Sequence, residues 1–83
     1  MKVKYFAWVR ERIGKAEEMI EPPESVRTVS ELIAWLTDRG EGYAYAFENP
    51  KVIRAAIDQA HVQPDVAISG AREIAFFPPM TGG

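Results

Sequence analysis

The chain has 83 residues, of which 47% are hydrophobic and 27% are charged, a composition typical of one compact soluble domain. Ten lysines and arginines against twelve acidic residues give a net charge of −2, which disfavours nucleic acid and membrane partners because both need a basic face. The absence of cysteine excludes a disulfide framework, a thiolate metal site and a cysteine nucleophile, and it fits a cytoplasmic location.

The first predicted element is a strand over residues 2–8, where side chains alternate with the period of two that a half-buried strand shows. Phe6 and Trp8 then fall on the face opposite the core residues of this strand. The apolar run at residues 5–9 is too short for a signal-peptide core or a membrane span.

A short helical turn is expected next, over residues 10–13, and Gly14 would end it in the left-handed conformation that glycine adopts easily. A second strand is predicted at residues 17–21, and the two prolines at 22–23 stop it. The two strands together would form a hairpin with a wide connection.

The clearest helix is predicted over residues 29–39, because apolar side chains recur at i, i+3, i+4 and i+7 from Val29. Thr28 and Glu31 have the spacing of a capping box, which satisfies two backbone donors at a helix start. Gly40 suits its C-terminal end.

The second half of the chain predicts three more strands. No element is predicted for the glycine- and aromatic-rich passage at 42–47, and residues 52–57 alternate as a third strand. A turn at 58–60 would lead into a short strand at 61–62. The last strand is predicted at 73–77, where two prolines follow.

This order of elements predicts an α+β domain in which one mixed sheet packs on one main helix, the β-grasp or ubiquitin-like architecture. The last strand is placed beside the first. The domain would span residues 1–79, and residues 80–83 would form a flexible tail.

The sequence offers no site for a self-contained enzyme or for a bound cofactor or metal. Both glycine-rich phosphate-loop spacings are absent, so nothing here would bind a nucleotide alone. His61 is the only imidazole and lacks companions at ligand spacing, which favours a surface histidine over a metal ligand or general base. The acidic pairs Glu11/Glu24 and Glu17/Glu18 are interpreted as solvated faces.

The end of the chain is the strongest functional signal. Met80, Thr81, Gly82 and Gly83 follow a strand that ends abruptly, so they would project as a thin arm with a free carboxylate at its tip. An arm without bulky side chains can enter a narrow channel and bring that carboxylate to the active site of another protein. The alternative is a frayed terminus without a role.

A second signal is a pair of aromatics predicted to be exposed. Phe6 and Phe77 fall opposite the core faces of their strands, so neighbouring first and last strands would join them into an apolar patch at the root of the tail. Such patches mark partner surfaces. The alternatives are a different strand register, or a second helix that covers this face.

Four segments carry a resemblance to a known family: FAWVRE at 6–11 followed by Gly14, Thr28-Val29 with Leu32, AIDQ at 56–59, and EIAFFPPMTGG at 73–83. They resemble the MoaD family of ubiquitin-like sulfur carriers, the small subunits of molybdopterin synthase. The resemblance runs over nearly the whole chain, and the C-terminal segment is its most specific part.

The resemblance implies a chemistry. An E1-like activating enzyme would use ATP to adenylate the carboxylate of Gly83, and sulfur transfer would convert it into a thiocarboxylate. The carrier would then dock on the large, catalytic subunit of molybdopterin synthase, in a heterotetramer, and thread Met80, Thr81 and Gly82 into its active site. There it would donate sulfur to cyclic pyranopterin monophosphate to build the dithiolene.

The partner-binding surface that the resemblance implies comprises Phe6, His61, Phe77, Pro78 and Pro79, and it would serve both partners in turn. A thiamine-type sulfur carrier and a ubiquitin-like protein modifier share the fold and the Gly-Gly end, and they remain alternatives. An alternative of another class is a β-grasp interaction module with an inert tail.

Overall fold

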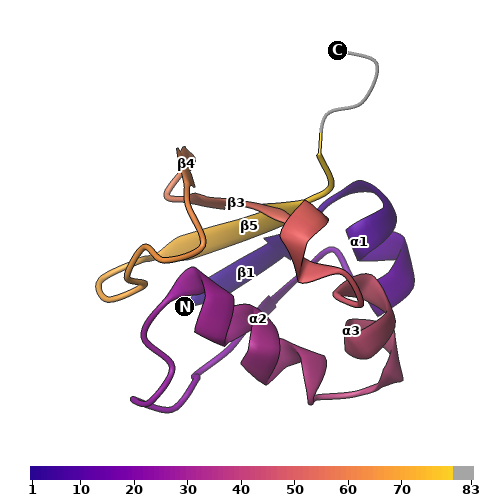
Figure 1. Cartoon of the computed structure of the whole chain (residues 1–83), viewed down its shortest axis with the longest axis horizontal. Helices are drawn as coiled ribbons and strands as arrows, with labels where there is room; N and C mark the ends of the chain where they lie inside the picture. The colour runs from indigo at the N-terminus through magenta and orange to yellow at the C-terminus, as the bar shows by residue number, and fades with distance from the viewer. Residues whose placement is uncertain (80–83) are drawn as a thin grey trace.

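The computed structural model describes residues 1–79, which form a five-stranded mixed sheet in the order β2-β1-β5-β3-β4 (Figure 1). The strands are β1 (Lys2–Tyr5), β2 (Glu17–Met19), β3 (Arg54–Ile57), β4 (Ala60–Val62) and β5 (Glu73–Phe77). The helices are α1 (Ala7–Ile13), α2 (Val29–Thr37), α3 (Glu41–Ala46) and the short 3-10 helix η1 (Pro50–Val52). β1 and β5 lie parallel at the centre, and the other neighbouring strands are antiparallel. The predicted α+β architecture, with the last strand beside the first, is confirmed.

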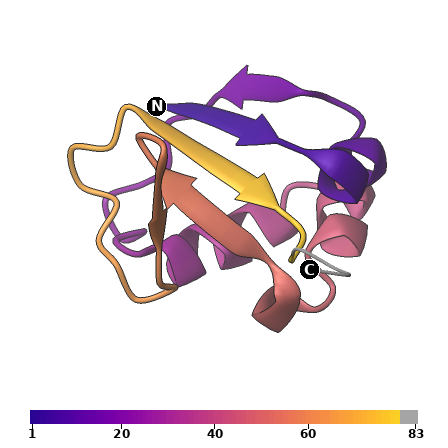
Figure 2. The same cartoon turned by 90° about the horizontal axis from the view of Figure 1, so that it is seen from above.

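The sheet has one covered and one open face. Figure 2 shows the sheet in front of α2, with α1 and α3 at the end where β1 and β5 finish. The covered face carries Val3 and Tyr5 of β1 and Ile74 and Phe76 of β5, and each of these is at most 1% exposed. The open face carries their neighbours in sequence: Lys2, Lys4, Glu73, Ala75 and Phe77. No helix of the described residues lies over the open face (Figure 2).

The main helix begins as predicted. The Glu31 backbone N–H donates to Thr28 Oγ1 at 3.1 Å, and the Thr28 backbone N–H donates to Glu31 Oε1 at 3.1 Å, so the capping box is complete. The apolar stripe of α2 is buried, with Leu32 and Leu36 fully enclosed. Burying each such side chain contributes about 2 kcal/mol.

The predicted strand over residues 2–8 was too long, because β1 ends at Tyr5 and α1 begins at Ala7. Ala7 has a φ of 53°, in the left-handed region that side chains other than glycine rarely adopt, and this turns the chain out of the sheet. Trp8 therefore lies on a helix and not on the sheet. Gly14 ends α1 in the predicted left-handed conformation, with a φ of 91°.

Two helical elements were absent from the prediction. Residues 41–46 form α3, and Tyr43, Ala46 and the C-cap residue Phe47 lie at i, i+3 and i+4 and pack on the core. The predicted third strand begins two residues later than residue 52, because Pro50–Val52 form η1.

The β3–β4 turn comprises two residues, one fewer than predicted, because β4 already begins at Ala60. Asp58 and Gln59 have φ of 48° and 74°, the pair of positive angles found in a type I′ turn. Asp58 Oδ1 accepts hydrogen bonds from the backbone N–H groups of Arg72 and Glu73, at 3.2 and 3.0 Å. This side chain therefore ties the turn to the start of β5.

Among the described residues, every helix is too short or too polar to cross a membrane.

Candidate functional site

The structure brings the predicted aromatic residues to the end of the sheet where β5 finishes. β1 and β5 are parallel neighbours, and the Phe6 backbone N–H donates to the Phe76 carbonyl at 3.1 Å. Phe6 keeps an extended conformation and is 46% exposed. Phe77 is half-buried and points to the open face. The condition on which the predicted patch depended, that the first and last strands are adjacent, is therefore met.

His61 joins Phe77 from the other side of β3. It lies on β4 opposite Ala56, and Ala56 lies opposite Ala75 of β5. Because both alanines are small, the imidazole reaches across the open face, and its ring centroid is 5.2 Å from that of Phe77. The histidine and the phenylalanine thus form one aromatic pair on that face.

Pro78 and Pro79 continue directly from Phe77 and are half-buried. We call Phe6, His61, Phe77, Pro78 and Pro79 the tail-root patch. The predicted tail residues, Met80 to Gly83, lie outside the described residues. The patch therefore surrounds the point where the chain leaves the described domain.

The open face of β1 and β2 is mostly charged, and Met19 is the exposed apolar residue among its ion pairs. Lys4 Nζ is 3.4 Å from Glu73 Oε1, and Lys2 Nζ is 3.4 Å from Glu17 Oε2. These ion pairs occupy the part of β1, β2 and β5 away from the tail-root patch. The aromatic part of the open face is concentrated where β5 ends, as a docking surface would require.

Trp8 does not belong to this surface. Arg12 places its guanidinium carbon 4.3 Å from the Trp8 ring centroid and 4.1 Å from that of Tyr45. Arg12 Nη1 also donates to the Tyr45 carbonyl at 3.2 Å. This stack joins α1 to α3 and holds α1 in place behind Phe6.

The interpretation of Glu17 and Glu18 as a solvated pair was wrong for Glu18. In the β1–β2 register, Glu18 lies opposite Val3, whose side chain is on the covered face. Glu17 lies opposite Lys4, whose side chain is on the open face. The Glu18 side chain is consequently 11% exposed, and that of Glu17 is 52% exposed.

Glu18 is the centre of a polar cluster. Its Oε2 accepts hydrogen bonds from the hydroxyls of Tyr5 at 2.8 Å and Tyr43 at 2.6 Å. Its Oε1 lies 3.3 Å from Arg39 Nη1 and 3.5 Å from Lys15 Nζ. Burial raises the pKa of this carboxyl, but the two hydroxyls and the two cations outweigh burial and leave the pKa below its ordinary value. Burial and the bond to Glu18 raise the pKa of Tyr5.

This cluster is structural, because it joins strands and helices below the sheet and faces away from the tail-root patch. Among residues 1–79, no three histidine or carboxylate side chains gather closely enough to hold a metal ion. The exposed aromatic side chains of the tail-root patch are suited to docking on another protein. Glu18 has the same parity as Ile20, the buried residue that follows β2, and this is the sequence signal that could have revealed the burial of Glu18.

Comparisons with known proteins agree with this picture. The profile of the ThiS family matches residues 3–83. The molybdopterin synthase sulfur carrier subunit of Escherichia coli is 36% identical over 83 residues, which cover all of this chain and 99% of that protein. The Haemophilus influenzae protein of the same name is 35% identical with the same coverage.

Solved structures show the same fold. A putative molybdopterin converting factor, subunit 1, from Pyrococcus furiosus superposes with a TM-score of 0.73 at 30% identity and covers 95% of both chains. Small archaeal modifier protein 1 of Haloferax volcanii has a TM-score of 0.71 at 21% identity and covers 96% of this chain and 97% of its own. The second likeness concerns the fold alone.

Proposed function

The chain belongs to the ThiS family, and on this premise we propose that it is the sulfur-carrier subunit of a molybdopterin synthase, acting in molybdenum cofactor biosynthesis. The observation that carries this proposal is the full-length identity of 36% to a subunit of that name. The tail-root patch supports it, because a carrier needs a docking surface around the base of the arm that it presents.

The reacting group in this proposal is the carboxylate of Gly83. A carboxylate is a poor electrophile, so an activating enzyme converts it with ATP into an acyl-adenylate and releases pyrophosphate. A sulfide equivalent then displaces AMP and leaves a thiocarboxylate. The side chains of Met80 and Thr81 and the bare backbone of Gly82 would occupy the narrow channel that leads to the partner's active site. Because this chemistry uses ATP and an intracellular partner, the proposal places the chain in the cytoplasm.

The large subunit of molybdopterin synthase is the acceptor of this arm. We expect the tail-root patch to dock on it, so that the thiocarboxylate sulfur reaches cyclic pyranopterin monophosphate, with two transfers for each dithiolene. The same patch would dock on the activating enzyme, so the two partners would compete. The chain would itself supply a substrate and a docking surface, without a catalytic group, in a heterotetramer built on a dimer of large subunits.

The test is intact-protein mass spectrometry after incubation with the cognate activating enzyme, ATP and a sulfur donor. We expect a mass gain equal to the exchange of one oxygen for one sulfur, confined to the C-terminal peptide. A chain that lacks Gly83 is the matched control, and it should show no gain while it still binds both partners. No gain in the intact chain, with an activating enzyme that is demonstrably active, would contradict the proposal.

The acceptor distinguishes the remaining alternatives. A thiamine-type carrier or a protein modifier would also gain sulfur or be adenylated, but it would not convert cyclic pyranopterin monophosphate when mixed with the large subunit. An interaction module with an inert tail would bind its partners equally well with and without Gly83. Conversion of the pterin by the purified pair decides between these outcomes.

A further inference from the structure

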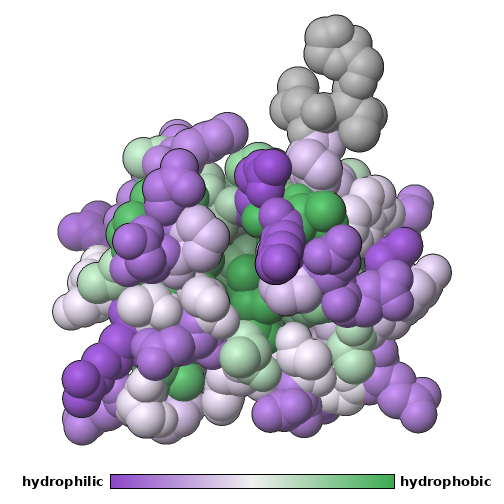
Figure 3. Space-filling model, in the orientation of Figure 1, coloured by the Kyte–Doolittle hydropathy of each residue, from purple (hydrophilic) through white to green (hydrophobic). Residues whose placement is uncertain are grey.

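A groove lies on the side of the molecule where β3 borders the N-terminal half of α2. It has a volume of about 610 Å³, within the range of sites that take a small ligand or a few side chains of a peptide. Figure 3 shows it as a hollow whose floor is apolar and whose rim is hydrophilic. Nothing in the proposed function above uses this groove.

The groove exists because β4 leaves β3 early. The last pair between the two strands is Ala55 with Val62, after which the chain is held against α2. The Ser30 backbone N–H donates to the Pro64 carbonyl at 2.9 Å, and the Val29 backbone N–H donates to that of Val66 at 3.1 Å. These bonds fix the segment after β4 against the start of α2, so the position of this wall of the groove is set by the backbone.

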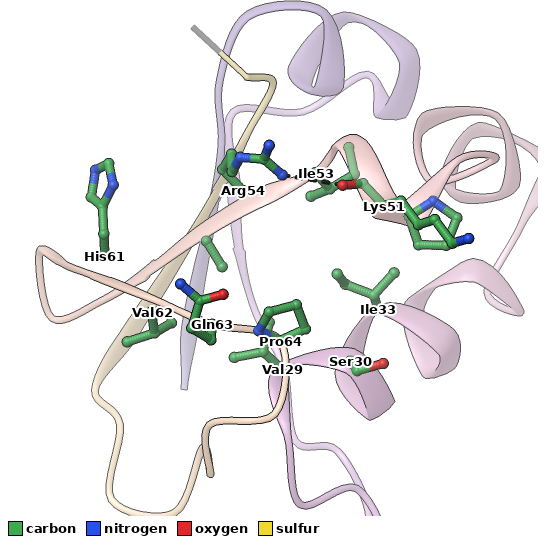
Figure 4. Close-up of a pocket in the computed structure, with 12 residues that line it drawn as sticks. Val29, Ser30, Ile33, Lys51, Ile53, Arg54, His61, Val62, Gln63 and Pro64 are labelled. Atoms are coloured by element: carbon green, nitrogen blue, oxygen red, sulfur yellow. Dashed lines mark hydrogen bonds between the residues drawn. The ribbon is translucent and has the colours of Figure 1, made fainter.

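The lining of the groove has a definite chemistry. Val29 and Ile33 of α2 and Ile53, the residue before β3, supply apolar side chains to its floor (Figure 4). Ala55 of β3 also lines the groove. Lys51 and Arg54 lie at the rim, and Arg54 Nη1 donates to the Lys51 carbonyl at 3.1 Å. No carboxylate is among the residues that line it. An occupant that complements this lining is apolar and carries negative charge at one side.

The groove is continuous with the tail-root patch. His61 contributes to the lining, while its ring points away from the groove (Figure 4) and pairs with Phe77. Arg54 lies directly opposite Phe77 in the β3–β5 register. A protein that covers the patch would therefore reach the cationic rim of the groove without leaving the surface.

We propose that this groove binds a short apolar segment of the large subunit, with a flanking carboxylate held by Lys51 and Arg54, when the tail-root patch docks on that subunit. This inference rests on the proposed function for the identity of the partner. The groove would add a second anchor, separate from the tail, that fixes the rotation of the domain while the arm enters the active site.

The first experiment reverses the charge of the rim. The variant carries Lys51→Glu and Arg54→Glu together, and its matched control carries Arg27→Glu and Arg72→Glu, two exposed arginines away from the groove. Both variants change the net charge equally, so long-range steering affects them alike. Binding to the purified large subunit is measured by calorimetry, after urea unfolding has shown that both variants are folded. We expect about a tenfold loss of affinity for the rim variant and less than about threefold for the control.

The second experiment maps the contact directly by NMR on the wild-type domain. Methyl signals of Val29, Ile33 and Ile53 should shift on addition of the large subunit, together with those of the tail-root patch. If only signals of the tail-root patch shift, and both variants bind the large subunit with equal affinity, the proposed role of the groove is overturned and the proposed function stands. A loss of affinity for the activating enzyme alone would overturn the assignment to the large subunit. Failure of the wild-type chain to bind the large subunit would overturn both proposals.

Discussion

Phe76 and Phe77 are adjacent in β5, but their side chains lie on opposite faces of the sheet and differ in burial. Phe76 is fully buried on the covered face, where its ring lies 5.5 Å from that of Phe47 and 6.5 Å from that of Tyr5. Phe77 lies on the open face, and its aromatic neighbour there is His61. One strand therefore supplies stability with one side chain and presents the next on the open face.

The same division occurs on the edge strand β2. Glu18 on the covered face is held by two tyrosine hydroxyls and two cations, whereas Glu17 on the open face has one ion pair, with Lys2. Two residues of identical chemistry are thus structural or solvated according to parity alone. The comparison shows that a shift of register by one residue would exchange the side chains of the covered face and the open face.

The largest expected effect is the difference between Phe76 and Phe77 in what each contributes to the free energy of unfolding. Phe76→Ala should lower the free energy of unfolding by about 4 kcal/mol, because it removes a large side chain from the closed core. Phe77→Ala should lower it by about 1 kcal/mol, because much less surface is buried there. Urea unfolding of both variants measures the difference. Equal losses would show that the open face belongs to the core.

The next effect separates the two glutamates. Glu18→Ala should cost about 3 kcal/mol, because the buried hydroxyl of Tyr5 loses its acceptor and Arg39 and Lys15 lose their counter-charge. Glu17→Ala removes one exposed ion pair and should cost about 0.5 kcal/mol or less. The two midpoints of urea unfolding give the comparison, and a Glu18 variant as stable as the Glu17 variant would refute the role of the cluster.

Binding to a partner should depend on the open face, whereas stability depends on the covered face. Phe77→Asp should keep the fold and weaken binding to the large subunit and the activating enzyme by about 30-fold, a loss of about 2 kcal/mol that is typical of a central aromatic contact. Titration calorimetry with each partner measures this. An unfolded variant would place Phe77 in the core, and unchanged affinity would remove it from the docking surface.

Two glycines near the start of α3 test how closely the helices pack below the sheet. An added Cβ at Gly42 would lie 2.9 Å from the Arg12 carbonyl, which is backbone and cannot move freely. Gly42→Ala should therefore destabilise the domain by about 1 kcal/mol net, despite the better helix propensity of alanine. Gly40→Ala is the control, because its nearest contact would be an ordinary 3.7 Å from the Tyr43 ring. Thermal unfolding of both variants decides the matter.

The smallest expected effect is a pH dependence. Because the pKa of Glu18 in the folded chain lies below its ordinary value of 4.5, the cluster stabilises the fold above that value and loses this contribution as pH falls through the folded pKa. The stability gap between the wild type and Glu18→Gln should therefore narrow below about pH 4.5. Urea unfolding at a series of pH values measures the gap, and a gap independent of pH would contradict the assignment.

Most of the fold could be predicted from the periodicity of apolar residues and from the residues that begin and end helices and strands. Residues 73–77 were predicted with their correct bounds and faces, because Ile74 and Phe76 fall on one face, Glu73 falls on the other, and two prolines follow. The start of α2 was equally clear from Thr28 and Glu31. These signals come from residues close together in the sequence. The structure adds which strands and helices lie beside each element.

The errors arose where local patterns were ambiguous. Residues 2–8 alternate beyond Tyr5, and the pattern does not reveal that Ala7 adopts a left-handed angle. The six residues of α3 are too few for a strong helical period, and glycine at position 42 weakens the pattern further. Helix assignment there depends on packing against α1, which the sequence does not show.

The site was predictable in part, because exposure can be read from parity but contacts between distant segments cannot. Phe6 and Phe77 were placed on the open face by alternation alone. The approach of His61 to Phe77 depends on the small side chain of Ala56 between them, and the groove depends on the early departure of β4 from β3. Both are properties of tertiary arrangement, so the sequence alone did not reveal them.

The parallel pairing of β1 with β5 makes closure of the sheet a long-range step in folding. The two neighbouring strands are separated by residues 6–72 along the chain. Until residues 73–77 have joined the sheet, β1 has one edge unpaired and the core lacks Ile74 and Phe76. Formation of this pairing requires the ends of a long loop to meet, so we expect it to limit the rate at which the domain folds.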